Sequence, residues 1–322
     1  MPDIGFIWLP RSVHEAVAIA RGVEAGGFWG LGISDSPVLY QEMYPVVSAC
    51  LAATEHIKVG SNVTNPVSRH WTIHASSARA YEELHPERYY LGLASGDGAV
   101  HSIGRRPATL GHLARAVDDM RGAIPDTTEI QVAASGPRAA AMAGSVADSV
   151  ILGTGAEPAA VAELGGLARA SAAERGKRAP RIWGLIPTYI VDDDADLAQA
   201  RRDYAAIPVA YARFAFDVTF ASKHIPTELQ APLRAGLDRY DFGHHATVGV
   251  PNPNAHLFDD TPEVLDYLFE RMVLFGTREQ CATRLERFLD TADVDGVHLT
   301  IIAPDPVKVV ERAGDAFAHL VG

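Results

Sequence analysis

Short apolar segments alternate with longer amphipathic segments along almost all of the 322 residues. Short runs of β-branched and aromatic residues predict strands, whereas apolar positions repeating every three or four residues predict helices. Regular alternation of the two is typical of a parallel sheet covered by helices. Eight strand and helix pairs predict a (β/α)8 TIM barrel. The strands are expected at 4–9, 28–34, 57–63, 89–94, 129–133, 149–152, 182–191 and 296–302.

One irregular interval, residues 205–260, interrupts the alternation between the seventh and eighth expected strands. It contains two expected helical pieces separated by residues 240–254, which are rich in Gly, Pro and Asn. A long excursion in a compact domain usually has a function, and the aromatic residues and adjacent histidines here favour an ordered lid over a surface loop. We therefore expect residues 1–322 to form one α/β domain with a lid at 205–260.

The composition excludes several classes of protein. Hydrophobic residues make up 48% of the chain, which is enough for a large core. The net charge of −12 argues against nonspecific binding of nucleic acids or anionic membranes, since such binding needs clustered Lys and Arg. Cys50 and Cys281 are far apart and lack metal-ligand spacing, so they are expected to be buried thiols. The chain enters its first strand without a leader pattern or a membrane-length apolar run, and we expect a cytoplasmic protein without a metal site.

The candidate site follows from the fold, because TIM barrels carry their chemistry at the carboxyl ends of the strands. Three of the expected strand ends combine glycine with the start of a helix. Glycine lets backbone amides approach an anion, and a helix N-terminus adds partial positive charge. Ordinary turns are the alternative for each segment. The candidate phosphate-binding residues are Ser135, Gly136, Pro137 and Arg138 on one strand end, and Gly153, Thr154 and Gly155 on the next.

Titratable residues at the same end are candidates for acid and base chemistry. Asp35 follows the second strand and could act on a ligand or cap the following turn. Asp97, within Ser-Gly-Asp-Gly, has the same two interpretations. His70 precedes a helix that it could cap, whereas the adjacent His244 and His245 lie on the expected lid. Signatures of serine hydrolases, zinc peptidases, P-loop enzymes and Rossmann dehydrogenases do not occur in the sequence.

Several motifs occur together in a fixed order. They include Ile33-Ser-Asp35, Val63-Thr-Asn-Pro-Val-Ser-Arg-His70, Leu91-Gly-Leu-Ala-Ser-Gly-Asp97 and Ala134-Ser-Gly-Pro-Arg138. Together with Phe275-Gly-Thr-Arg-Glu-Gln-Cys281, they resemble the bacterial luciferase-like flavin and deazaflavin oxidoreductases along nearly the whole chain. Within that family, the segment ending at His70 is most similar to the branch of the F420-dependent methylenetetrahydromethanopterin reductases.

The resemblance implies a site for a cofactor ring. An isoalloxazine or deazaflavin ring is expected across the third strand, backed by a cis peptide at Asn62–Val63. Many relatives have Asp-His after the second strand, whereas this chain has Asp35-Ser36, so the proton donor stays open among His70, His244 and His245. The residues that match the ring site are Asp35, Asn62, Val63, Thr64, Asn65, Ser95, Gly96 and Asp97, and the two glycine-containing segments match the phosphate side.

The resemblance also implies an activity. The expected function is hydride transfer between coenzyme F420 and a small organic substrate, in a homodimer. One alternative is an FMN-dependent monooxygenase that uses reduced flavin and O2. An alternative from another class is a noncatalytic barrel that binds a flavin or a partner.

Overall fold

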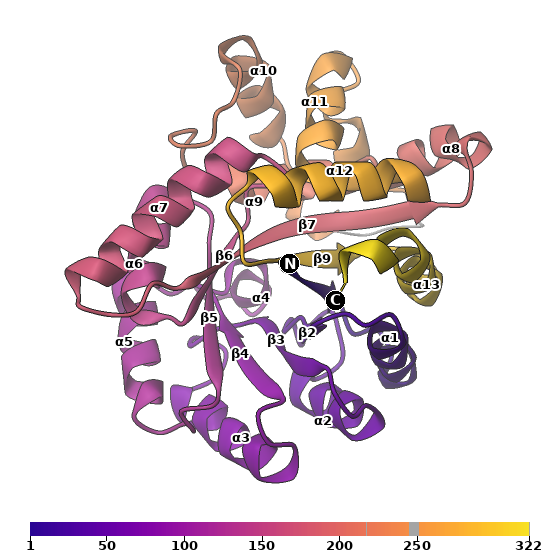
Figure 1. Ribbon diagram of the computed structural model, residues 1–322. Coiled ribbons are helices and arrows are strands. Elements are labelled where there is room, and N and C mark those ends of the chain that lie inside the picture. Colours follow the sequence, from indigo (N-terminus) through magenta and orange to yellow (C-terminus); the bar gives the residue numbers. More distant parts are fainter. Residues whose placement is uncertain (217, 245–250, 322) are drawn as a thin grey trace.

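The computed structural model describes residues 1–216, 218–244 and 251–321, which form a closed parallel barrel (Figure 1). β1 pairs with both β2 and β9, and β7 pairs with both β6 and β9, so eight strands close the ring. The predicted (β/α)8 TIM barrel is therefore confirmed. The barrel strands are β1 (Asp3–Trp8), β2 (Gly30–Ile33), β3 (Lys58–Thr64), β4 (Tyr89–Leu93), β5 (Glu129–Ala134), β6 (Ser149–Leu152), β7 (Arg181–Val191) and β9 (Gly296–Ile301).

Helices surround the strands as an outer layer (Figure 1). Their starts follow the expected capping chemistry: Ser12 caps the first of them, and Thr277 with Gln280 forms a capping box on another. A short helix, α4 (Asp97–His101), follows β4 and begins at the Asp97 of the Ser-Gly-Asp-Gly segment. The outer helices are α1 (Val13–Ala25), α2 (Met43–Ala53), α3 (Trp71–Leu84), α5 (Leu110–Arg121), α6 (Pro137–Val146), α7 (Pro158–Glu174), α12 (Arg278–Thr291) and α13 (Pro306–Phe317).

A ninth strand, β8 (Leu274–Thr277), was not predicted. β7 is 11 residues long, and only its first part, Trp183–Thr188, pairs with β9. Its last part, Thr188–Val191, extends beyond the barrel and pairs with β8 in parallel. A four-residue strand directly before a helix start gives little periodicity, which is why the sequence did not reveal it.

The interval between β7 and β8 is mostly helical and has its own apolar cluster, which includes Tyr204, Phe216, Leu233, Phe258 and Phe269. The two expected helices of residues 205–260 do not flank the irregular stretch: both precede it. In Figure 1, α10 and α11 project at the top, on the side opposite α2 and α3. The elements are α8 (Asp194–Tyr204), α9 (Ala206–Phe216), α10 (Thr227–Leu237), η1 (Phe242–His244), η2 (Pro253–His256) and α11 (Pro262–Met272).

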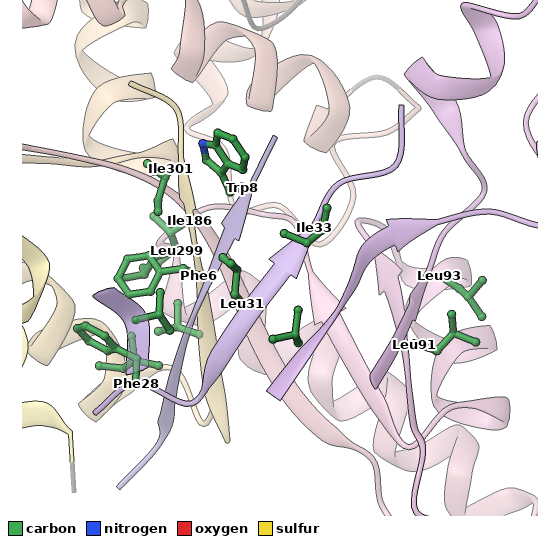
Figure 2. Packing of buried hydrophobic residues seen from close by; sticks show 14 of the residues in the cluster. Phe6, Trp8, Phe28, Leu31, Ile33, Leu91, Leu93, Ile186, Leu299 and Ile301 are labelled. Atoms are coloured by element: carbon green, nitrogen blue, oxygen red, sulfur yellow. The ribbon is translucent and has the colours of Figure 1, made fainter. Parts of the chain in front are cut away.

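The main core lies between the barrel and its helices. Alternate strand residues such as Phe6, Leu31 and Leu299 point outward into this layer (Figure 2). The predicted burial of Cys50 and Cys281 is confirmed, and burial raises the pKa of each thiol to about 12. Among the helices of the described residues, none combines the length and the apolar character needed to cross a bilayer.

Large side chains fill the barrel interior near its centre. The Trp183 and His298 rings stack with centroids 4.3 Å apart, and the Tyr90 ring stacks on His298 from 6.2 Å. His298 Nε2 lies 3.0 Å from Gln131 Oε1, which connects β9 with β5 across the interior. We call these four buried residues the barrel floor, because they close the interior beneath the carboxyl ends of the strands.

Candidate active site

Above the barrel floor, the interior side chains are partly exposed and smaller than the rings of the floor. Moving two residues along a strand returns to the same face of a sheet, so Ala133 follows Gln131 and Leu185 follows Trp183 on the interior face. Both are partly exposed, as are Val63 on β3 and Gly153 after β6. A Cβ atom on Gly153 would meet nothing closer than Leu185 Cδ2 at 3.9 Å and Ser135 Cβ at 4.0 Å. We call the space lined by these residues the upper recess.

β3 reaches the upper recess through a bulge. The pairing of β3 with β4 shifts between Ser61 and Thr64, so three steps on β3 match two on β4. The expected cis peptide at Asn62–Val63 is present there. Ser61 Oγ donates to Gly92 O and accepts from Gly92 N, both at 2.9 Å, which ties the bulge to β4. The bulge thus brings Val63 into the interior, where its Cγ1 faces Gly92.

Asp35 is buried at the end of β2 and makes two strong contacts. Thr64 Oγ1 donates a hydrogen bond to Asp35 Oδ2 at 2.6 Å, and Arg69 Nη2 donates to Oδ1 at 2.7 Å. The same guanidinium group bonds to the half-exposed Glu42 at 2.9 Å. Burial raises the pKa of Asp35 above its usual value, and the bonds from Thr64 and Arg69 offset only part of the rise. The carboxylate therefore fixes the end of β3 to the end of β2.

Asn65 is fixed from a different side by a buried histidine. His74 Nε2 lies 3.3 Å from the Asn65 carbonyl oxygen, and Nδ1 lies 2.5 Å from the Tyr44 hydroxyl. Burial lowers the pKa of His74 to about 4, so the neutral ring donates from Nε2 and accepts from Tyr44. Gly96 adjoins the other side of Asn65: its φ of +94° is left-handed, and a Cβ would lie 2.6 Å from Asn65 Cγ. Only glycine fits at this contact.

The low pKa of His74 predicts how stability depends on pH. The unfolded chain takes up this proton near pH 6.5, whereas the folded protein resists protonation until about pH 4. The free energy of unfolding is therefore expected to fall by up to about 3 kcal/mol between pH 6.5 and pH 4 on account of this residue. His74→Gln should flatten that part of the curve, as measured by urea denaturation at several pH values. An equally steep dependence in the variant would contradict this origin.

The candidate phosphate segments also lie at the open end of the barrel. Ser135 and Gly153 are neighbours, and Gly136 is the N-cap of α6, whereas Arg138 is exposed. Thr154 is fully buried, and its hydroxyl has no hydrogen-bond partner among the described residues. Gly155 has a left-handed φ of +76°. The structure thus places both predicted segments beside the upper recess, with Pro137 as the first residue of α6.

The predicted catalytic histidines that the structure describes, His70 and His244, are much more exposed to solvent than Asp35. His70 is exposed and caps α3 through its Nδ1, which accepts from Thr72 N at 3.4 Å. His244 is half-exposed, with Nδ1 2.7 Å from Asp241 Oδ2. His245 lies outside the described residues. Asp97 begins α4 beside His101, and burial raises its pKa above the usual value.

Residues of the 205–260 segment approach the same open end. Tyr211, on α9, lies beside Thr300 of β9, and burial raises the pKa of its hydroxyl group to about 12. Arg213, two residues further along α9, acts electrostatically on Asp97 beyond β4. Tyr211 and His74 had no distinguishing signal in the sequence. Arg69 belonged to the motif that ends at His70, but its bond to Asp35 was not predicted. α9 therefore lies near the strand ends of both β4 and β9.

Comparison with known proteins gives consistent relatives. The chain is 24% identical over 322 residues to a 5,10-methylenetetrahydromethanopterin reductase from Methanolobus tindarius, covering 92% of this chain and 93% of the relative. The solved structure of the coenzyme F420 dependent tetrahydromethanopterin reductase from Methanopyrus kandleri superposes with a TM-score of 0.77 at 18% identity, covering 100% and 99% of the two chains. An F420-dependent secondary alcohol dehydrogenase in complex with an F420-acetone adduct matches with a TM-score of 0.72 at 17% identity, covering 98% of each chain.

A family model describes almost the entire chain. The model for luciferase-like monooxygenases matches residues 7–123 and 111–295, which run from the end of β1 to the residue before β9. The chain therefore belongs to the luciferase-like monooxygenase family, whose members are oxidoreductases.

Proposed function

We propose that the protein transfers a hydride between coenzyme F420 and an organic substrate. The observation that supports this most directly is the upper recess, because small interior residues on neighbouring strands leave space for a flat ring above a closed floor. The reductase from Methanolobus tindarius and the two enzymes of similar structure are F420 or methanopterin enzymes by name, which favours the deazaflavin. The homodimer, the cytoplasmic location and the single domain belong to the same proposal, and the homodimer rests on the resemblance alone.

The residues of the open end fit such a cofactor. Asn62, Val63, Thr64 and Asn65 would support the ring, together with Ser95, Gly96 and Asp97, and the segments 135–138 and 153–155 would hold the phosphate side. When bound, F420 supplies the carbon that carries or accepts the hydride. The protein's contribution is positioning.

Three arrangements provide that positioning. The bonds from Thr64 and Arg69 to Asp35 hold the β3 end in one orientation, and His74 holds the Asn65 carbonyl group. The 205–260 segment would act as the lid, since Tyr211 and Arg213 on α9 approach two separate strand ends. A substrate between the ring and α9 would be shielded from water.

An FMN-dependent monooxygenase is the competing function, because the family model is described as that of luciferase-like monooxygenases. Fluorescence titrations of the purified protein with F420 and with FMN separate the two. We expect F420 to bind at least tenfold more tightly than FMN. Tight binding of FMN without binding of F420 would overturn the proposal in favour of the flavin.

A further inference from the structure

Two buried cations lie close together beyond the end of β6, and neither is part of the predicted cofactor site. Lys223 is fully buried, and its Nζ has no hydrogen-bond partner among the described residues. Arg271 is 3% exposed, and its Nε and Nη2 likewise have no partner in the described part of the chain. Buried charges are normally paired with an opposite charge, because leaving water is costly. No ion pair within 4 Å joins either residue to a carboxylate among the described residues.

Both side chains are held in place by their surroundings. Arg271 Nη1 donates to the Tyr267 hydroxyl at 2.7 Å, and the guanidinium carbon lies 5.1 Å from the centre of the Phe216 ring. Next to Lys223, His224 bonds to Glu163 of α7 at 2.8 Å, which fixes this turn on the barrel. The two charges act on each other, since burial and the proximity of Arg271 together lower the pKa of Lys223 to about 8. Two like charges held together favour an anion between them.

The loop after β6 contacts the backbone of Arg271. Ala156 N donates to the Arg271 carbonyl oxygen at 2.7 Å, and a Cβ on Gly155 would lie 2.4 Å from that oxygen. Thr154 precedes this contact and has a buried hydroxyl without a partner among the described residues. Its hydroxyl group can donate a hydrogen bond to an anion, as can the free nitrogen atoms of Arg271 and Lys223.

We propose that Lys223 and Arg271, with Thr154, bind a phosphate group carried by a ligand. Arginine presents a planar pair of donors and lysine a point charge, a combination that suits a tetrahedral dianion. The group would belong either to the anionic tail of the cofactor or to a phosphorylated substrate. The site is independent of whether the upper recess takes F420 or FMN, because both cations come from the insertion between β7 and β8.

Thermal unfolding with and without inorganic phosphate tests the site, with sodium chloride at equal ionic strength as the reference. At phosphate concentrations about tenfold above its dissociation constant, we expect the wild-type Tm to rise by about 2 °C. Lys223→Met keeps a similar side-chain length without the charge, and it should weaken phosphate binding at least tenfold. Without phosphate, its Tm should equal or exceed that of the wild type, because an unpaired buried charge has been removed.

Lys308→Met is the matched control, since Lys308 is an exposed residue on α13 and its loss changes the net charge by the same amount. This variant should retain the full phosphate response. The proposal is overturned if the wild type shows no response beyond that in chloride, or if Lys223→Met responds as the wild type does. A lower Tm for Lys223→Met with an intact phosphate response would show a structural role instead.

Further titrations identify the source of the phosphate group. If the phosphate group belongs to the cofactor, Lys223→Met should lower the affinity for FMN or F420 at least tenfold. The affinity for riboflavin, or for the deazaflavin ring without its tail, should stay unchanged. If it belongs to the substrate, cofactor affinity should stay the same in the variant, and inorganic phosphate should still stabilise the cofactor-loaded wild type. Both results support the site, and they are measured by binding rather than turnover.

Discussion

A leucine at position 153 is expected to weaken cofactor binding by at least about 100-fold while the protein stays folded. Gly153 faces the upper recess, and the nearest atoms to an added Cβ are 3.9 and 4.0 Å away. A leucine side chain would extend from there into the space proposed for the ring. A 100-fold loss corresponds to about 2.7 kcal/mol of binding free energy. Because the recess is open, we expect the free energy of unfolding to change by less than about 1 kcal/mol.

Gly153→Ala is the matched control, because a methyl group fits at ordinary van der Waals distances. It should bind the cofactor within about threefold of the wild type. Fluorescence titration gives the affinities, and urea denaturation shows whether each variant is folded. Unchanged cofactor affinity in a folded Gly153→Leu variant would place the ring elsewhere.

Arg69→Met is expected to destabilise the protein by about 3 kcal/mol at pH 8. The substitution leaves the buried Asp35 carboxylate with the Thr64 hydroxyl group but without a positive charge. Loss of one partner of a buried ion pair is costly because the other charge remains desolvated. Contact of the guanidinium group with the Tyr44 ring, 5.6 Å from its centre, is lost as well.

The effect should depend on pH in a defined direction. The folded-state pKa of Asp35 is already raised above 3.8, so the folded protein binds this proton more readily than the unfolded chain. The stability contributed by Asp35 therefore falls as the pH rises from the pKa of the unfolded chain to the higher pKa of the folded protein. Removing Arg69 raises the folded-state pKa further, so the destabilisation should be smaller at pH 5 than at pH 8.

Two further variants separate the contributions to this network. Glu42→Gln removes the half-exposed partner of the same guanidinium group and should cost less than about 1 kcal/mol. Adding Asp35→Asn to Arg69→Met should recover part of the loss, because the buried charge is then gone. Urea denaturation at both pH values measures all four proteins. Equal losses for Arg69→Met and Glu42→Gln would contradict a buried pair with Asp35.

The βα alternation was sufficient to predict the barrel, because the local sequence pattern of each strand and helix agrees with its place in the overall fold. The strands from β1 to β7 and β9 were expected near their observed positions. β8 was not, since four residues beside a helix cap carry no period of their own. In residues 205–260 the helices were expected on both sides of the irregular stretch. Both helices, α9 and α10, instead precede it and pack in the apolar cluster of the insertion.

The site was predictable where it depends on strand ends. Asp35 and Thr64 follow from this rule, because neighbouring parallel strands end at the same edge of the barrel. The bond from Arg69 to Asp35 was not predictable, and neither was the contact of His74 with Asn65, since both depend on how α3 packs. Lys223 belongs to an insertion whose placement no strand pattern specifies.

A crystal structure of the protein with F420 tests the central proposal most directly. We predict that the deazaflavin ring lies in the upper recess against Val63, with Ala133 and Gly153 beside it and the barrel floor beneath. A ring bound outside this recess, or crystals soaked in F420 that take up none while FMN occupies the recess, would contradict the account.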